Sequence, residues 1–464
     1  MELFFDPDDD RSAIRQLYEQ IRDAILDGRL TAGDRLLPTR GVAADLGLAR
    51  STITEAYGRL TAEGYVEGRA GGGSVVAERL VAYPDSEMPA ALTPTPLAAS
   101  LRAYDPAPEA RARFDLRAGR VDAGLFPVAA WRRCQLAALR RAPGQYSDPA
   151  GSTALRTALA HWMAASRGVT VTPEQIVVTS GTSHAIDLVA RVLLEPGDVV
   201  AVEEPGYPPV RELLRAHRLD VAGVPVDRHG IVVDAIPPAA RLVCVTPSHQ
   251  YPLGVLLGRQ RRRDLLRWAR RADAAIIEDD YDSEFRHTPG PLEPLHRLDR
   301  DGRVIYVGTF SKTLSPAIRT GFMAAPHTLI PALTAARQIV DWCPPATTQQ
   351  ALTLFLNDGH LSRHLHRARA VYTQRHTRLH HELRQRLPAG YRLLPADAGL
   401  HLAVVGPNTP PDPDLRHRAA ARGVLLTSLR RSYQQHPTAS FLLGFGALPT
   451  GRVAPAVAAL TEAL

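Results

Sequence analysis

Lysine is almost absent from this chain. The 464 residues contain 55 Lys and Arg together, and Lys312 is the single lysine among them. A guanidinium cannot be deprotonated in a protein and therefore cannot form an imine with a carbonyl compound, whereas a lysine amine can. Lys312 is thus a candidate Schiff-base residue. The alternative is a surface position that has stayed lysine by chance, and its neighbours decide between the two.

Cysteine is also scarce. The three cysteines, Cys134, Cys244 and Cys343, are odd in number, far apart and without the spacing of metal ligands. This pattern argues against a structural zinc and suits a reducing cytoplasm, so we expect no metal centre.

Long apolar runs are missing as well. Residues 1–6 lack a basic stretch followed by an apolar one, so we expect no signal peptide. No apolar run approaches the roughly 20 residues that span a bilayer. Because the length favours two domains, we expect a cytoplasmic protein of two domains.

The N-terminal part lacks an excess of positive charge. The net charge is +7, but residues 1–80 contain ten Arg against fourteen Asp and Glu. Bulk charge therefore gives no support for nucleic-acid binding by this part of the chain, and such a role has to be argued from the sequence pattern.

Two helices are predicted in the first fifty residues. Apolar residues recur at helical spacing between Ser12, which is a suitable N-cap, and Gly28, which ends the pattern. A second, shorter helix is predicted to begin at Thr39 and to end at Gly47. The tight turn after Gly47 leads directly into further helical pattern.

A third helix and a hairpin follow. The helix is predicted to begin near residues 51–52, where Thr52 and Glu55 have the spacing of a capping box. The glycine cluster 71–73 separates two short strand patterns and predicts a hairpin over residues 65–76. Two helices across a tight turn, followed by a hairpin, are typical of a winged helix-turn-helix.

The start of the third helix is the predicted recognition surface. Short donors and one arginine gather where a recognition helix meets base edges and phosphates. Arg40 is a further phosphate contact and Arg69 lies in the predicted wing. The candidate DNA-binding residues are Arg40, Arg50, Ser51, Thr52, Thr54 and Arg69. The alternative is a small helical domain whose polar face is merely solvated.

The segment LLPTRGVAADLGLARSTITEAYGRLTAEGYVEG resembles a known family. Its Leu-Pro-x-x-Arg motif, the Arg50-Ser51 pair and the pattern Leu60-x-x-x-Gly64-Tyr65 resemble the winged helix-turn-helix of the GntR family of bacterial regulators, over about residues 12–77. The resemblance implies DNA binding by an N-terminal domain, which we place at residues 1–78.

Prolines mark a connector between the domains. No hydrophobic period runs through residues 79–113, which contain Pro84, Pro89, Pro94, Pro96, Pro106 and Pro108 among alanines and short polar residues. This composition predicts a semi-extended linker, followed by a large domain over residues 114–464.

Short apolar runs alternate with helical patterns in the large domain. Five runs are predicted strands, at 176–179, 199–202, 242–246, 275–278 and 304–308. Their nearly continuous hydrophobicity is typical of strands buried on both faces of a parallel sheet flanked by helices, which defines an α/β fold. Ligands of such sheets bind outside the carboxyl ends of the strands.

Residues with chemical functions follow all five runs. A helix that starts with small residues can bind a phosphate through its N-terminus. An aromatic side chain can stack on a flat ligand, and an acidic side chain and a phenol come before the lysine. In chain order these candidates are Ser180, Gly181, Thr182, Tyr207, Gln250, Asp279, Tyr281, Ser311, Lys312 and Arg319. The set fits pyridoxal 5′-phosphate, because an Asp keeps the pyridine nitrogen of that cofactor protonated while a lysine holds its aldehyde.

The same motifs resemble those of a second family. EEPGYPP, IIEDDYDSEFR and TFSKTLSPAIRTGF are similar to the motifs of fold-type I aminotransferases. The resemblance implies that Lys312 forms the imine, Asp279 contacts the pyridine nitrogen, Tyr281 contacts the ring oxygen and Tyr207 stacks on the ring. It implies phosphate ligands at Ser180, Thr182, Ser311 and Arg319, and a contact from Tyr146 to the phosphate in a partner subunit.

One position departs from the aminotransferase pattern. Amino-acid aminotransferases bind the substrate carboxylate with an arginine in a C-terminal strand, and the corresponding stretch here, 439–446, has Leu442 at that place. Leucine cannot bind a carboxylate. Arg430 and Arg431 lie nearby in sequence, but a pair of arginines in an arginine-rich chain is usually at the surface. Ordinary transamination of an α-amino acid is therefore in doubt, and we expect at most a half-transamination.

The combination of the two domains resembles the MocR subgroup of the GntR regulators. This resemblance covers nearly the whole chain and implies a homodimer that binds operator DNA and uses its aminotransferase-like domain as a sensor. The missing arginine favours a sensor of pyridoxal phosphate itself. Alternatives are a sensor of an amine or amino acid such as GABA, a working aminotransferase with an added DNA module, and a repressor with a cofactor-free body.

Overall fold

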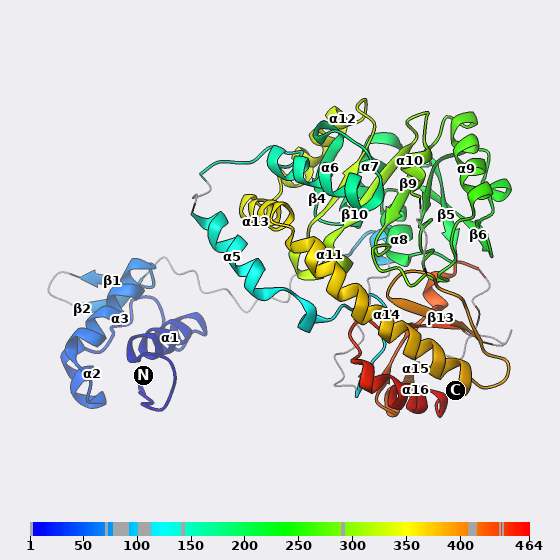
Figure 1. The fold of residues 1–464 in the computed structure, drawn as a ribbon. Coiled ribbons are helices and arrows are strands. Elements are labelled where there is room, and N and C mark those ends of the chain that lie inside the picture. The colour runs from blue at the N-terminus through cyan, green and yellow to red at the C-terminus, as the bar shows by residue number, and fades with distance from the viewer. Residues whose placement is uncertain are drawn as a thin grey trace. The chain divides into compact units, whose positions relative to one another are not determined.

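The computed structural model describes residues 3–69, 73–77, 92–100, 113–140, 144–288, 293–406, 415–435, 438 and 440–464. Contacts divide the chain into two units, Met1–Thr93 and Pro94–Leu464, each with its own core (Figure 1). Most of the predicted linker, 79–113, lies outside the described residues. The described part of it contains the short helix α4 (Pro96–Ser100).

The first unit consists of three helices and a two-stranded antiparallel sheet. These elements are α1 (Ala13–Leu26), α2 (Thr39–Leu46), α3 (Arg50–Ala62), β1 (Val66–Arg69) and β2 (Gly73–Val76). The Ser12 hydroxyl accepts the Arg15 N–H, and Gly47 is left-handed with φ 65°, so the predicted start of α1 and end of α2 are confirmed. Leu17, Ile21 and Ile53 are fully buried in its core.

The predicted capping box of the third helix is wrong. Helix α3 begins at Arg50, its N-cap is Ala49, and no side chain caps its first turn. The tight connection after α2 starts the helix earlier, since the Thr52 N–H already donates to the Ala49 carbonyl at 3.0 Å. Thr52 therefore lies inside the helix, where its side chain cannot act as an N-cap.

An eight-stranded sheet forms the centre of the second unit. Its order is β4-β11-β10-β9-β8-β5-β6-β7. The four central strands β10, β9, β8 and β5 are mutually parallel, whereas β11 is antiparallel to both of its neighbours. The strands are β4 (Ile176–Thr179), β5 (Val199–Glu204), β6 (Asp220–Asp227), β7 (Gly230–Ile231), β8 (Ala240–Val245), β9 (Ala275–Asp280), β10 (Val304–Thr309) and β11 (Gly321–Ala324). All five predicted strands are therefore confirmed.

Helices cover both faces of this sheet. Leu188, Leu214 and Leu333, from three different helices, pack with one face, and Leu265 packs with the other. The helices of the unit are α5 (Val128–Leu139), α6 (Thr153–Arg167), α7 (Thr182–Leu193), α8 (Pro208–Ala216), α9 (Arg259–Arg271), α10 (Leu295–Leu298), α11 (Phe310–Thr313), α12 (Ile330–Asp341), α13 (Ala346–Asn357), α14 (His360–Arg386), α15 (Leu415–Ala421) and α16 (Val453–Thr461). Burial on both faces explains why the strands read as continuous apolar runs.

A second, four-stranded sheet follows the long helix α14. Its order is β12-β13-β16-β15, and all its pairs are antiparallel. The strands are β12 (Arg392–Leu393), β13 (His401–Val405), β15 (Thr427–Ser428) and β16 (Ser440–Gly444), while β3 (Phe114–Asp115) pairs separately with β14 (Val424–Leu425). The start of the large domain is thus tied to its C-terminal part.

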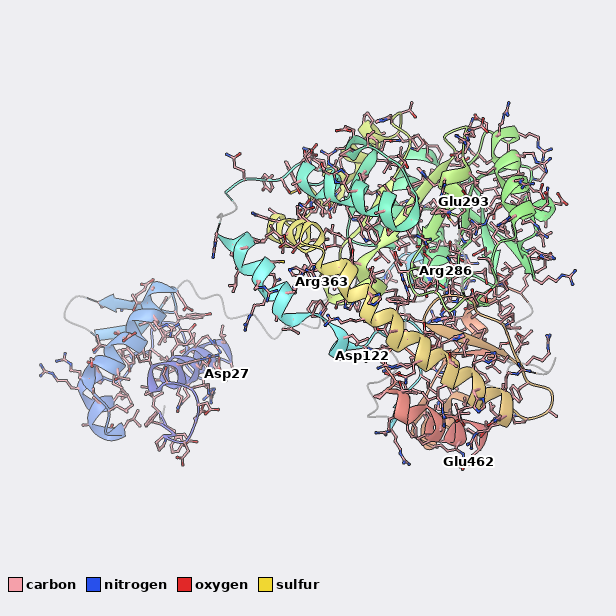
Figure 2. All side chains as sticks on the ribbon, viewed as in Figure 1. Asp27, Asp122, Arg286, Glu293, Arg363 and Glu462 are labelled. Carbon is pink, nitrogen blue, oxygen red and sulfur yellow. The ribbon has the colours of Figure 1, made fainter. Side chains whose placement is uncertain are left out.

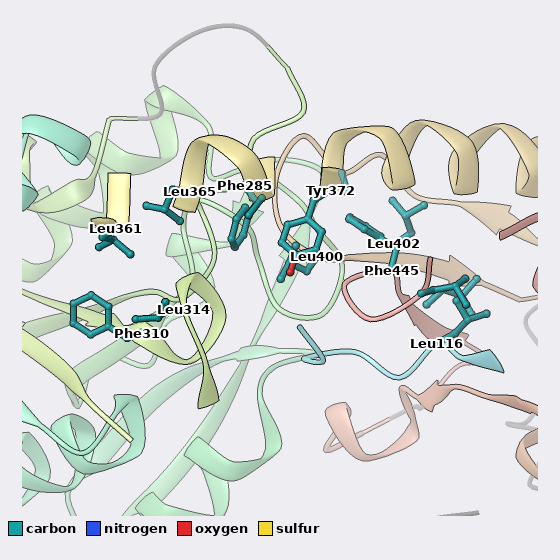
Figure 3. Packing of buried hydrophobic residues seen from close by; sticks show 14 of the residues in the cluster. Leu116, Phe285, Phe310, Leu314, Leu361, Leu365, Tyr372, Leu400, Leu402 and Phe445 are labelled. Carbon is teal, nitrogen blue, oxygen red and sulfur yellow. The ribbon is translucent and has the colours of Figure 1, made fainter. Parts of the chain in front are cut away.

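One buried cluster joins the two sheets to α14. Phe285 and Tyr372 meet edge to face with ring centroids 4.9 Å apart, and Leu402 and Phe445 continue the cluster into the smaller sheet (Figure 3). Burying each of these side chains stabilises the fold by roughly 1.5–3 kcal/mol. Among the helices of the described residues, none is long and apolar enough to cross a membrane.

Candidate functional site

The predicted recognition residues lie on the surface of the first unit. Arg40, Arg50, Ser51, Thr54 and Arg69 are exposed, and Thr52 is half-buried. The opposite face of α3 is buried through Ile53, Ala56, Tyr57 and Leu60. This division leaves the start of α3 available to a nucleic acid, although the Thr54 hydroxyl already donates to the Arg50 carbonyl at 2.9 Å.

The candidate cofactor residues gather where the central strands end. Asp279 is the fifth residue of β9, and its strand partner across the parallel pair is Val307 of β10. Lys312 lies in α11, the four-residue helix that directly follows β10. Thr182 begins α7, which follows β4. The fold therefore brings the candidates from three strands to the same end of the sheet, where the carboxyl ends of these strands lie.

The Lys312 amine points into the interior. Its Nζ donates a hydrogen bond to the Gly119 carbonyl at 2.7 Å. Gly119 has φ 84°, and a Cβ at this position would lie 2.9 Å from Nζ, so the lysine needs a glycine here. Burial lowers the pKa of Lys312, against the opposing effect of Asp282 and Asp279. A lowered pKa favours the neutral, nucleophilic amine.

Asp279 is a buried carboxyl without a cationic partner. The Thr182 hydroxyl donates to its Oδ1 at 3.3 Å, and within the described residues no ion pair reaches it. Burial, followed by repulsion from Asp280, raises the pKa of Asp279 to about 8. Asp280 differs, because it is paired with Arg167 and accepts the Tyr306 hydroxyl. The first acid therefore faces a site, while the second is part of the core.

A buried histidine and aspartate lie beside Tyr281. The Tyr281 hydroxyl donates to the His249 carbonyl at 3.0 Å and lies equally close to His249 Nδ1. His249 Nδ1 is also 3.0 Å from Asp282 Oδ1. The His401 ring packs on that of His249 with centroids 4.5 Å apart, and burial lowers the pKa of His401 to about 3. This group fixes where the Tyr281 hydroxyl sits.

Small residues and an arginine form the candidate phosphate cradle. Gly181 has φ 117°, and a Cβ there would lie 3.6 Å from the Arg319 guanidinium. Gly321 packs directly against Gly181, since its Cβ would lie 2.9 Å from the Gly181 Cα. Ser180 directly precedes Gly181, and the Ser311 hydroxyl accepts a bond from Thr309 at 3.1 Å. The Arg319 guanidinium therefore lies beside the backbone at the start of α7, and a helix start is a common place for a phosphate.

Two candidates contribute in different ways. Tyr207 is 41% exposed, meets Tyr251 edge to face at 5.1 Å, and lines one pocket together with Asp279. Gln250 is buried, and its amide is bonded to backbone: Nε2 donates to the Pro205 carbonyl at 2.9 Å and Oε1 accepts the Leu253 N–H. The amide of Gln250 therefore holds the loop together.

Leu442, the residue expected at the place of the aminotransferase arginine, is buried. It lies in the middle of β16, opposite Ala403 of β13, and is fully buried. It packs with Ala403 and Leu429, with Tyr251 and Tyr433 beside them. Arg430 and Arg431 are both exposed. This surface is apolar and offers no guanidinium from β16.

Tyr146 lies on the surface. It is 77% exposed and stacks on Trp342, with ring centroids 4.9 Å apart. Trp342 and Ile339, at the end of α12, are 54% and 86% exposed. A stacked aromatic pair beside exposed aliphatic side chains forms an apolar patch on the large unit.

Sequence reasoning missed three parts of this site. Gly119 precedes the first strand-like run, and nothing in its local pattern indicates that it meets Lys312. Asp282 and His401 are far apart in sequence, and the packing of His249 between them depends on tertiary contacts. The sequence did contain one indication of Asp282, because this residue directly follows Tyr281 in the acid-rich segment after β9.

The fold and site define an aminotransferase-type body joined to a helix-turn-helix module. Residues 114–441 match the class I and II aminotransferases, and residues 13–76 match the gntR family of bacterial regulatory proteins. The chain belongs to the GntR family, in the MocR group whose members carry an aminotransferase-like domain. It is therefore a DNA-binding transcription regulator.

Relatives of this kind are similar along nearly the whole chain. The probable rhizopine catabolism regulatory protein MocR of Rhizobium meliloti is 35% identical, over 96% of this chain and 92% of that protein. The pyridoxine biosynthesis transcriptional regulator PdxR of Corynebacterium glutamicum is 34% identical, over 92% and 90%. Kynurenine aminotransferase of Pyrococcus horikoshii, solved in complex with PMP, superposes with a TM-score of 0.74 and 26% identity, over 80% of this chain and 96% of that one.

Proposed function

We propose that the second unit binds pyridoxal 5′-phosphate and that the protein regulates transcription in response to the level of this cofactor. Asp279 supports the cofactor assignment, because it is a buried acid that forms no ion pair among the described residues. A protonated ring nitrogen would compensate it. When bound, the cofactor supplies an electrophilic aldehyde on an electron-withdrawing ring.

Each residue of the site has a role in this proposal. Lys312 holds the aldehyde carbon through its amine, and Gly119 keeps that amine oriented in the free protein. Asp279 would keep the ring nitrogen protonated, while the Tyr281 hydroxyl, which donates to the His249 carbonyl in the free protein, would contact the ring oxygen. Tyr207 would stack on the ring. The residues that would hold the phosphate at the start of α7 are Ser180, Gly181, Thr182, Ser311 and Arg319.

The buried Leu442 favours pyridoxal phosphate over an α-amino acid as the effector. A sensor of α-amino acids needs a cation for the carboxylate, whereas Leu442 of β16 packs with Ala403 of β13 and with Leu429, Tyr251 and Tyr433. Burying an unpaired carboxylate against that face is costly. The name of the PdxR relative, a regulator of pyridoxine biosynthesis, supports the same effector.

We propose that the protein acts on DNA as a homodimer in the cytoplasm, with residues 79–113 as the linker between its domains. The apolar patch of Tyr146, Ile339 and Trp342 supports a subunit contact on the large unit. In that arrangement Tyr146 would reach the phosphate in the partner. The exposed start of α3, with Arg50 and Ser51, would enter the major groove, while Arg40 and Arg69 contact phosphates.

The test is a binding titration in which the cofactor and the amines compete as effectors. Binding to DNA from upstream of the protein's own gene is measured by anisotropy with added pyridoxal phosphate, or with GABA and a panel of amino acids. The proposal expects a shift of the DNA dissociation constant with pyridoxal phosphate. Identical DNA binding with and without the cofactor, together with a response to an amino acid, would overturn it.

A further inference from the structure

A second cavity lies in the large unit, away from the residues assigned to the cofactor. It has a volume of about 590 Å³ and lies between the end of α6, the segment after β9, and α14. Its polar lining comes mainly from Arg167, Ser283, Glu284, Arg286, Arg297 and Arg369. Arg286 and Glu293, which also lines it, are labelled in Figure 2. None of these residues has a role in the cofactor site.

Buried polar atoms in this lining lack partners. Ser283 is 1% exposed and Glu284 is 7% exposed, yet Ser283 Oγ and Glu284 Oε2 form no hydrogen bond within the described structure. Arg286 Nε is buried and unpartnered in the same way. Leaving such a group unsatisfied costs about 1–3 kcal/mol. The three residues line the cavity, so a polar group inserted there would lie close to these unsatisfied atoms.

The charges of the lining favour an anion. Arg369 donates through Nε to the Glu284 carbonyl at 3.0 Å, which holds its guanidinium at the cavity. Burial, with repulsion from Arg167 and Arg369, lowers the pKa of Arg286. Arg167 is already neutralised by Asp280. Neither Arg286 nor Arg369 forms an ion pair among the described residues, although Asp397 lies near enough to Arg286 to oppose the lowering of its pKa. Both guanidinium groups can therefore still bind an anionic ligand.

Arg297 forms the outer wall. Its Nε is 3.2 Å from Glu293 Oε1, and its guanidinium approaches Gly168 so closely that a Cβ there would lie 2.8 Å away. This ion pair is half exposed and belongs to the rim. Ser283 and Glu284 are buried, whereas Arg286 is half-buried and Arg369 is exposed.

We propose that this cavity binds a small-molecule oxyanion, a phosphate or carboxylate group, held by the guanidinium groups of Arg286 and Arg369. Glu284 accepts a hydrogen bond from a donor group on the same molecule. The site is separate from that of Lys312. The segment from Tyr281 to Arg286 contributes to both sites, since Tyr281 faces His249 while Ser283 and Glu284 line the cavity.

Inorganic phosphate is the probe. The full-length protein is saturated with pyridoxal phosphate, so that the cofactor site is occupied, and the melting temperature is followed as phosphate is added at constant ionic strength with sodium chloride. We expect a saturable rise in melting temperature that remains after cofactor saturation. If the rise disappears once the cofactor is bound, or if chloride alone reproduces it, the proposal fails.

Four variants locate the site. Arg286→Gln and Arg369→Gln each weaken phosphate binding at least tenfold, because each removes a charge-assisted hydrogen bond. Glu284→Gln tightens it, since a buried acid repels this probe. Arg363→Gln, an exposed arginine of α14 outside the cavity, leaves it unchanged. Arg369 is exposed, so its variant keeps the test valid even if Arg286→Gln fails to fold. If Arg286→Gln, Arg369→Gln and the wild type all bind phosphate with equal affinity, the proposal is overturned.

Discussion

Replacing Asp279 by Asn tests the cofactor site by separating stability from binding. In the cofactor-free protein this carboxyl is buried and forms no ion pair with any described residue, so removing its charge should stabilise the fold. In the cofactor-bound protein the same carboxyl would pair with a protonated ring nitrogen, so the substitution should weaken binding. Asn has nearly the same shape as Asp, and few other contacts change.

The magnitude follows from the pKa of Asp279. Its pKa is about 8 in the folded chain against an ordinary value of 3.8. The folded protein therefore holds a proton that the unfolded chain releases, and stability falls as the pH rises from about 4 to about 8. At pH 7 the accumulated loss is at most about 4 kcal/mol, at about 1.4 kcal/mol per pKa unit. Backbone relaxation and entry of water reduce this upper bound.

Urea unfolding of the cofactor-free protein between pH 5 and pH 9 measures the effect. Asp279→Asn should be more stable than the wild type above pH 6, and its stability should depend less on pH. Its dissociation constant for pyridoxal phosphate should rise by a factor of 100 or more, since breaking a buried ion pair costs about 3–5 kcal/mol. The matched control is Asp280→Asn, which loses the Arg167 pair and should be less stable. If Asp279→Asn lowers stability as Asp280→Asn does, or binds the cofactor normally, the reasoning is wrong.

Three further predictions concern DNA binding, assembly and the core. Arg50→Ala should weaken operator binding and lower the slope of its salt dependence by about 1, whereas Arg29→Ala, an exposed arginine paired with Asp27 outside α3, should bind normally in the same anisotropy assay. Trp342→Glu should shift the protein from dimer to monomer in sedimentation experiments, because it puts a charge into the apolar patch; an unchanged dimer would exclude this patch as the interface. Ile53→Ala should destabilise the first unit by about 2–5 kcal/mol in thermal unfolding, since Ile53 is fully buried. A smaller effect would mean that its surroundings collapse.

Local pattern was sufficient to predict much of this fold. The strands β4, β5, β8, β9 and β10 are buried on both faces, and such strands leave a continuous apolar run in the sequence. The order of the candidate residues then followed from the rule that ligands bind at the carboxyl ends of parallel strands. Strand β11 is four residues long and does not stand out from its surroundings as a separate apolar run, so it was not predicted.

Tertiary contacts account for what could not be predicted. Thr52 and Glu55 have the spacing of a capping box, but the connection from α2 fixes the start of α3 at Arg50. Gly119 meets Lys312 across 193 positions of sequence, and only the folded chain brings them together. The apolar surroundings of Leu442 also depend on the pairing of β16 with β13. Local sequence contains no information on any of these contacts.

The most direct test of the central claim is the affinity for operator DNA, measured by anisotropy during a titration with pyridoxal phosphate, for the wild type and Lys312→Ala. The account predicts that the cofactor changes the DNA dissociation constant of the wild type, and that Lys312→Ala loses both this response and the visible absorbance of lysine-bound cofactor. A wild type whose affinity for DNA is the same at every cofactor concentration would contradict the account.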